Sequence, residues 1–219
     1  IPDVDGKVVI LHTNDTHGAD LDEEGTSFGM AGVAQLKKDF EAAGADVLLV
    51  SAGDSIMGKP LVSADQGKSA IEFMNAAGYD AMTVGNHELD LPPAVWEQLR
   101  QTIAQSGCRL LQNQTISLEM PGSVPLYLAG ADLAYGVYRD ENRKFRNLQP
   151  YTAADLENDL GRRRGCTVLL AHNPLLLDSY TGWGADLVLC GHVHGGLVRL
   201  PFLGGVLSGE TASVVAAAK

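Results

Sequence analysis

The 219-residue sequence predicts an α/β fold in a single domain. Short apolar runs alternate with amphipathic stretches, which is the pattern of strands that are each followed by a helix. The length suits one large domain with a substantial core and is short for two. With 45% hydrophobic and 20% charged residues, the composition excludes a disordered or fibrous chain. No apolar stretch approaches the roughly 18 residues that suggest a membrane span.

The first half of the chain has the clearest strand and helix patterns. Its opening run, KVVILHT, is apolar and rich in β-branched residues, which favours a buried strand. Apolar side chains at helical spacing, each followed by a glycine, favour helices between the strands. Strands are predicted over residues 7–13, 46–52 and 80–84, and helices over residues 30–43 and 66–77.

The second half begins with a helix that Pro93 opens. The choppy segment 115–137 predicts short antiparallel strands. Thr152 and Asp155 resemble a capping box, and the helix that they start is expected to end in Arg162, Arg163 and Arg164, since cations suit a helix C-terminus. The remaining predicted strands cover residues 108–113, 166–172 and 186–191.

The formal net charge of −11 at pH 7 indicates an acidic surface. Such a surface repels a phosphate backbone, so a nucleic-acid polymer is not an expected partner. A small phosphate would be repelled too, unless bound cations supply positive charge locally. Cys108, Cys166 and Cys190 lack metal-binding spacing and are expected to be reduced thiols in the core. The sequence assigns no compartment.

Residue types that bind metals follow almost every predicted strand. In open α/β sheets, sites form beyond the carboxyl ends of strands, so these residues can converge. Asp, Asn and His together supply oxygen and nitrogen donors that suit Mn²⁺, Fe, Zn²⁺ or Ni²⁺ better than Ca²⁺. The five blocks are Asp15-Thr16-His17, Gly53-Asp54, Gly85-Asn86-His87-Glu88, His172-Asn173 and Gly191-His192-Val193-His194-Gly195.

The placement of histidine strengthens this interpretation. Five of the six histidines lie in the five blocks, and His12 is the exception. A lone histidine at a strand end is usually structural, but five gathered at four strand ends, each beside Asp, Asn or Gly, are hard to explain by packing. Strand alternation points His12 away from the others, so we expect a core or sheet residue there.

The ordered motifs DTH, GD, GNHE, H and GHVH resemble those of calcineurin-like metallophosphoesterases. The resemblance extends from about Val8 to Gly196, and the order of all five blocks makes it specific. It implies an α/β/β/α fold, in which a sandwich of two β-sheets is flanked by helices and two metals lie at the sheet edge. It also implies hydrolysis of phosphate esters by a hydroxide that bridges two divalent cations.

The same resemblance implies a role for each motif residue. Asp54 would bridge the two divalent cations. His87 would lie outside the metal ligands and contact the substrate. Asp15, His17 and His194 would hold the first ion, and Asn86, His172 and His192 would hold the second.

The opening stretches ILHTNDTHG, SAGDSIMGKP and GNHELD resemble the catalytic domain of the 5′-nucleotidase branch in particular. That resemblance implies that Asp90 orients His87, three residues earlier. An equally weighted alternative is that Asp90 caps the following helix. The second half resembles single-domain bacterial phosphoesterases of another branch, so we expect no further domain with aromatics that grip a nucleobase.

We therefore expect an enzyme that hydrolyses a small phosphomonoester or phosphodiester with two divalent cations. The alternative is a non-catalytic scaffold or phosphate-binding protein, since fold alone does not determine function. Such proteins typically lose site residues, whereas every motif position is filled here. If the second sheet ends early, an edge strand near residues 197–207 would be exposed, which predicts a homodimer or a cover formed by residues 211–219.

Overall fold

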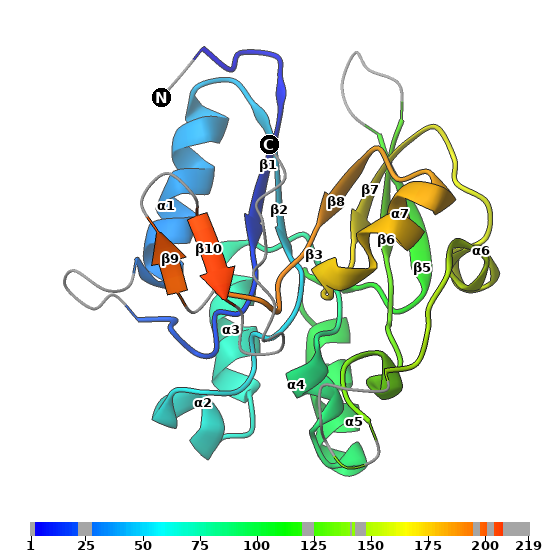
Figure 1. Ribbon diagram of the computed structural model, residues 1–219. Coiled ribbons are helices and arrows are strands. Elements are labelled where there is room, and N and C mark those ends of the chain that lie inside the picture. The colour runs from blue at the N-terminus through cyan, green and yellow to red at the C-terminus, as the bar shows by residue number, and fades with distance from the viewer. Residues whose placement is uncertain are drawn as a thin grey trace.

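The computed structural model describes residues 3–21, 28–119, 125–140, 142, 148–194, 198–200 and 204–207, the last two ranges by their backbone alone. Figure 1 shows two β-sheets side by side, with helices on the outer side of each. Each of the two sheets has four strands. The predicted α/β sandwich with flanking helices is confirmed.

The first sheet is parallel and has its strands in sequence order. Parallel neighbours require crossover connections, and helices provide them here. Its strands are β1 (Val8–Thr13), β2 (Asp46–Ser51), β3 (Ala81–Met82) and β4 (Arg109–Leu110). The accompanying helices are α1 (Gly29–Ala42), α2 (Pro60–Ala64), α3 (Lys68–Ala77), α4 (Asn86–Leu89) and α5 (Pro93–Ala104). The third and fourth strands are therefore shorter than the sequence pattern predicts.

The second sheet is mixed, because β5 and β6 pair antiparallel while its other neighbours are parallel. The antiparallel pair confirms the prediction for residues 115–137. The strands of this second sheet are β5 (Gln114–Leu118), β6 (Leu126–Gly130), β7 (Cys166–Leu170) and β8 (Leu187–Leu189). The helical elements here are η1 (Tyr135–Val137), α6 (Ala153–Leu160), η2 (Pro174–Leu176) and α7 (Leu177–Trp183).

A separate antiparallel pair follows, formed by β9 (Val198–Leu200) and β10 (Gly204–Leu207). Its backbone pairs with neither four-stranded sheet in the described part of the chain. Residues 211–219, the predicted cover, lie outside the described residues. Association with a second copy therefore stays a prediction.

The core follows the alternation of side chains along the strands. In β2, Leu49 packs toward the helices that cover the first sheet, whereas Leu48 and Val50 face the second sheet. In β7, Val168 lies between the sheets and Leu169 lies under the helices on the other side. Successive side chains of a strand point to opposite faces, so strands covered on both faces read as continuous apolar runs. Three apolar layers thus separate the four layers of the α/β/β/α sandwich.

The predicted end of the helix that starts at Thr152 is wrong. Helix α6 starts at the predicted Thr152–Asp155 capping box but ends at Leu160, before the arginines. Gly161 follows with a φ of 74°, a backbone conformation that favours glycine and stops the helix. Arg163 instead pairs with the Asp186 carboxylate at 2.9 Å.

The cysteines are only partly in the core. All three are free thiols in the described residues, and Cys108 is buried. Cys166 is exposed, because it is the first residue of β7 and lies outside the packed part of the strand. Among the described helices, none combines the length and apolar character needed to cross a bilayer.

Candidate metal centre

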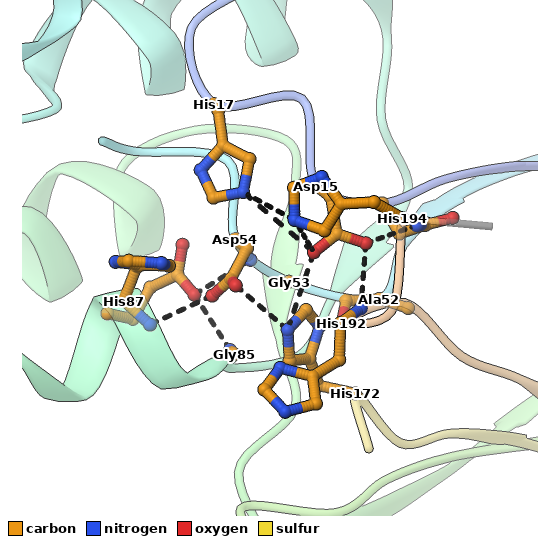
Figure 2. A network of polar contacts seen from close by, with 12 residues as sticks. Asp15, His17, Ala52, Gly53, Asp54, Gly85, His87, His172, His192 and His194 are labelled. Atoms are coloured by element: carbon orange, nitrogen blue, oxygen red, sulfur yellow. Dashed lines mark hydrogen bonds and ion pairs between the residues drawn. The ribbon is translucent and has the colours of Figure 1, made fainter. Parts of the chain in front are cut away.

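The candidate residues converge where strands of both sheets end. Asp15 and His17 follow β1, and Asp54 follows β2. His172 comes after β7 in the second sheet, so the two sheets contribute to one place. Figure 2 shows these side chains gathered in one place. His87 from the segment after β3, and His192 and His194 from the segment after β8, lie around them.

Three side chains form what we call the first ligand cluster: Asp15, His17 and His194. One ligand atom from each lies within 4.8 Å of the others. The Nε2 atoms of His17 and His194 are 3.2 Å apart, and their rings are stacked. Asp15 Oδ1 lies 3.9 Å from the first of these nitrogens and 3.5 Å from the second. These are the three residues that the family resemblance implies for the first ion.

A second ligand cluster consists of Asp54, His172 and His192, again within 4.8 Å and all buried. Asp54 Oδ2 lies 2.9 Å from His172 Nε2. His172 Nε2 is also 3.6 Å from Asp15 Oδ1, which joins this cluster to the first. Asp54 additionally groups with His17 and His87 within the same limit. Its carboxylate therefore lies between the two clusters, where a bridging ligand is expected.

Backbone carbonyls fix the orientation of two of the imidazoles. His17 Nδ1 lies 3.0 Å from Met57 O, and His172 Nδ1 lies 2.7 Å from Ala52 O. A carbonyl oxygen can only accept a hydrogen bond, so each Nδ1 carries the proton. The lone pair of each Nε2 then points into the clusters, as in metal-ligating histidines whose other nitrogen is bound to a carbonyl.

The electrostatics of the second ligand cluster favour positive charge. Burial alone would raise the pKa of Asp54, but the hydrogen bond and charge of His172 hold it at about 2. Burial alone would lower the pKa of His172, but Asp54 raises it to about 9. Since the carboxylate and the imidazole nitrogen face each other at 2.9 Å, a proton or a metal cation must lie with them.

The donor set fits divalent cations. Two ligands of one ion, each at about 2 Å, lie roughly 3–4 Å apart, which is the range of the separations around Asp15 Oδ1. That oxygen and Asn86 Oδ1 are buried, and neither has a hydrogen-bond partner among the described residues. Buried polar atoms normally have partners, so these two unsatisfied oxygens, one of which lies within 4 Å of three imidazole nitrogens, indicate a cation-binding role.

Backbone strain coincides with the candidate ligands. Non-glycine residues seldom adopt positive φ, and such residues gather at functional sites. Seven non-glycine residues with positive φ occur in the described part of the chain, and five of them are candidate ligands. The five are Asp15 (φ 48°), His17 (46°), Asp54 (56°), His192 (72°) and His194 (50°).

Two glycines allow the close approach of these turns. A Cβ at Gly85 would collide with Asp54 Oδ1 and would lie 2.7 Å from the backbone nitrogen of Asp54. A Cβ at Gly191 would lie 2.6 Å from Asp15 Oδ2 and 3.0 Å from His172 Cε1. Glycine is therefore required where the β3 and β8 turns pass the two carboxylates.

Sequence reasoning missed the function of Glu88. Its buried carboxylate accepts hydrogen bonds from the backbone N–H groups of Asp54 (2.9 Å), Ser55 (3.0 Å) and Gly85 (2.7 Å). Burial, together with the charge of Asp54, raises the pKa of Glu88 to about 7. Glu88 thus ties the turn after β2 to the turn after β3. Its place at the end of the GNHE motif was the available signal.

His87 lies beside the candidate ligands Asp54 and His17. Its backbone N–H donates to Asp54 Oδ1 at 2.9 Å, and burial lowers the pKa of its imidazole. The Nδ1 atom lies 3.9 Å from Asp90 Oδ2. Asp90 does not cap the next helix, because α5 has Pro92 at its N-cap and no side-chain cap bond.

This geometry defines the class of protein as an α/β sandwich with a cluster of metal ligands where strands of both sheets end. The chain belongs to the calcineurin-like phosphoesterase family, whose match covers residues 8–196. The family uses divalent metals, and the two ligand clusters supply candidate residues for them.

Curated relatives give a more particular similarity. The chain is 42% identical over 90 residues to a 5′-nucleotidase of Vibrio cholerae, which covers 39% of this chain and 16% of that protein. It is 40% identical over 96 residues to protein UshA of Escherichia coli, which covers 42% of this chain and 18% of that protein. The chain thus matches less than a fifth of the length of these relatives.

Solved structures share the fold over most of the chain. A 5′-nucleotidase precursor from Thermus thermophilus aligns with a TM-score of 0.62 at 18% identity, over 93% of this chain and 44% of that one. The sulfate thiohydrolase SoxB of Thermus thermophilus aligns with a TM-score of 0.62 at 16% identity, over 92% of this chain and 50% of that one. At these identities, the likeness concerns the fold alone.

Proposed function

We propose that this chain forms one catalytic domain that hydrolyses small phosphate esters with two divalent cations. Asp15, His17 and His194 hold one cation, Asn86, His172 and His192 hold the other, and Asp54 bridges them. The observation that carries the proposal is the joining of two ligand clusters through Asp54 and Asp15 Oδ1. Family membership supports the reaction class.

Divalent cations bound there would activate water and neutralise charge on the phosphoryl oxygens. The side chains of the protein supply oriented ligands and a proton donor. His17 and His172 are oriented by backbone carbonyls, so their Nε2 atoms need no rearrangement to bind. His87, whose side chain is 31% exposed beside Asp54, contacts the substrate and gives a proton to the leaving oxygen.

The donor set narrows the choice of metal. Imidazole nitrogen suits Zn²⁺, Fe, Ni²⁺ and Mn²⁺, whereas an all-oxygen site would favour Ca²⁺ or Mg²⁺. Each ligand cluster combines one carboxylate with two imidazoles. We therefore propose Mn, Fe, Zn or Ni as the resident metal.

The substrate is proposed to be a small phosphomonoester or phosphodiester. The relatives named 5′-nucleotidases support a monoester, and a nucleoside monophosphate is the first to test. The net charge of −11 argues against a nucleic-acid polymer, because such a surface repels a polyanion.

The test is metal reconstitution followed by measurement of phosphate or nitrophenol release. Chelator-treated protein is loaded with Mn²⁺, Fe²⁺, Zn²⁺ or Ni²⁺ and assayed on 4-nitrophenyl phosphate, bis(4-nitrophenyl) phosphate and AMP. We expect binding of two ions per chain and metal-dependent turnover. Tight metal binding without turnover on any ester would support the non-catalytic alternative.

His12 provides a matched control for the histidine ligands. It lies in β1, outside both ligand clusters. His12→Gln should keep the metal content and turnover within a few-fold, whereas His172→Gln should lose both. Equal losses in the two variants would mean that the histidine effects are structural.

A further inference from the structure

A positively charged side chain from the second half of the chain lies behind Asp90. Arg139 Nη1 is 3.7 Å from Asp90 Oδ2, the same oxygen that lies 3.9 Å from His87 Nδ1. Asp90 thus stands between a guanidinium and the imidazole of the proposed proton donor. The side chains of Arg139 and Asp90 are only 19% and 16% exposed, so water screens the pair less than it would on the surface.

The backbone that carries Arg139 is anchored to the candidate metal centre. Tyr138, the preceding residue, is fully buried, and its ring lies 5.0 Å from that of His192 and 6.0 Å from that of His172. The N–H of Arg139 donates to Tyr135 O at 3.1 Å. The position of Arg139 is therefore set by packing on the ligand histidines rather than by an exposed loop.

We propose that Arg139 is a positioning residue that acts through Asp90 on His87. The inference rests on the proposed function, because it concerns proton donation by His87. Arg139 holds Asp90 with one oxygen toward Nδ1 of His87, so that Nδ1 keeps its proton. The opposite ring nitrogen, Nε2, is then the atom that faces the substrate, and in the imidazolium form it carries the second proton, which passes to the leaving oxygen.

The distance from His87 Nδ1 to Asp90 Oδ2 is too long for a hydrogen bond, and a shift of about 1 Å closes it. Catalytic hydrogen bonds are often long without substrate and shorten in the complex. Without Arg139, the Asp90 carboxylate can turn toward the neighbouring cavity. That cavity, about 490 Å³ and lined by Asp90, Arg139, Tyr135 and Gln149, offers room for the movement.

The test compares esters that share a phosphate and differ in the leaving group. Glycerol phosphate needs a proton on its leaving oxygen, whereas nitrophenolate leaves readily without one. Arg139→Gln should lower kcat on glycerol phosphate about 10-fold or more, with a loss of less than about 3-fold on 4-nitrophenyl phosphate. Metal content should not change, and Arg139→Lys should recover part of the loss.

A double-mutant cycle separates this role from general destabilisation. Asp90→Asn should give the same leaving-group pattern, and adding Arg139→Gln should cost little more, since both act on His87. Arg162→Gln is the matched control, because Arg162 forms an ion pair with Glu157 while its side chain is 92% exposed. Additive effects, or equal losses on both esters, would overturn the proposal.

A second readout does not depend on turnover. In the metal-free protein, at a pH where the His87 ring is neutral, nitrogen NMR of the histidine rings should show its single ring proton on Nδ1. The His87→Gln variant provides the assignment of the signal. Arg139→Gln should shift that signal toward a mixture of tautomers, and an unchanged spectrum would contradict the positioning role of Arg139. If the metal-loaded wild-type protein is inactive on every ester, the proposed function is overturned as well. If the wild type is active and Arg139→Gln has the same ester preference as the wild type, only the positioning role of Arg139 is overturned.

Discussion

The carboxylate of Glu88 accepts a hydrogen bond of 2.9 Å from the backbone N–H of Asp54, the proposed bridging ligand. Asp54 itself accepts one of 2.9 Å from the N–H of His87. The turn after β2 and the turn after β3 are thus tied in both directions, because each carboxylate accepts a hydrogen bond from a backbone N–H of the other turn. Moving either turn would displace the bridging ligand and the proposed proton donor together.

Removing the Glu88 carboxylate should destabilise the fold. Glu88→Ala leaves three backbone N–H groups buried without acceptors, at about 1–3 kcal/mol for each unsatisfied donor. We expect a loss of about 3 kcal/mol or more in urea unfolding of metal-free protein. Glu88→Gln should lose less, because its amide oxygen still accepts. Glu97→Gln, on an exposed face of α5, is the control, and a loss there as large as for Glu88→Ala would contradict the role.

Asp54→Asn should weaken the binding of both ions, because one carboxylate serves both ligand clusters. The amide keeps the shape but removes the negative charge that His172 now faces at 2.9 Å. We expect turnover to fall by about 10³-fold or more. Metal content after dialysis, measured by mass spectrometry, should fall below that of the wild type for both ions. Retention of two tightly held ions would argue against a bridging position.

His87→Ala should lower kcat by about 10²-fold while the metal content stays unchanged, because His87 is assigned to proton transfer and not to metal binding. Metal analysis and steady-state kinetics on the same preparation provide the measurement. Loss of metal would mean that His87 is a ligand, in line with its grouping with His17 and Asp54. A loss of only a few-fold in kcat would leave His87 without a catalytic role.

Much of the centre was predictable because its residues are placed by strand ends. Asp15 and His17 directly follow an apolar run, and His192 and His194 follow another, so their convergence requires only that strands end at one edge. The layers were predictable for a similar reason. Alternation along β2 and β7 produces continuous apolar runs, which indicate strands covered on both faces.

Contacts between distant segments were not predictable in the same way. Arg139 meets Asp90 across 49 positions of the chain, and no local pattern marks that pairing. Helix α6 stops at Gly161 because of its backbone conformation, although the basic residues beyond it suit a helix end. The strands β3 and β4 are short because only two residues of each pair with a neighbour, a property of register rather than of composition.

A buried carboxylate outside the proposed ligands gives a prediction about stability. Asp20 is 3% exposed, and neither carboxylate oxygen has a hydrogen-bond partner among the described residues. Burial raises its pKa to about 6 from the ordinary 3.8. The folded state therefore favours the protonated acid, and the stability that this proton provides is lost as pH rises from about 4 toward 6.

Asp20→Asn should remove this dependence, since an amide does not titrate. At about 1.4 kcal/mol for each unit of pKa, the free energy of unfolding of Asp20→Asn relative to wild type should rise by about 2 kcal/mol between pH 4.5 and 7.5. Urea unfolding of metal-free protein at both pH values measures it. Asp155→Asn is the control: the pKa of Asp155 is lowered by its hydrogen bonds to Thr152, so its titration lies below this window and its difference from wild type should stay nearly constant. A constant difference for Asp20→Asn as well would show that Asp20 is ionised in the folded protein throughout, with a compensating positive charge.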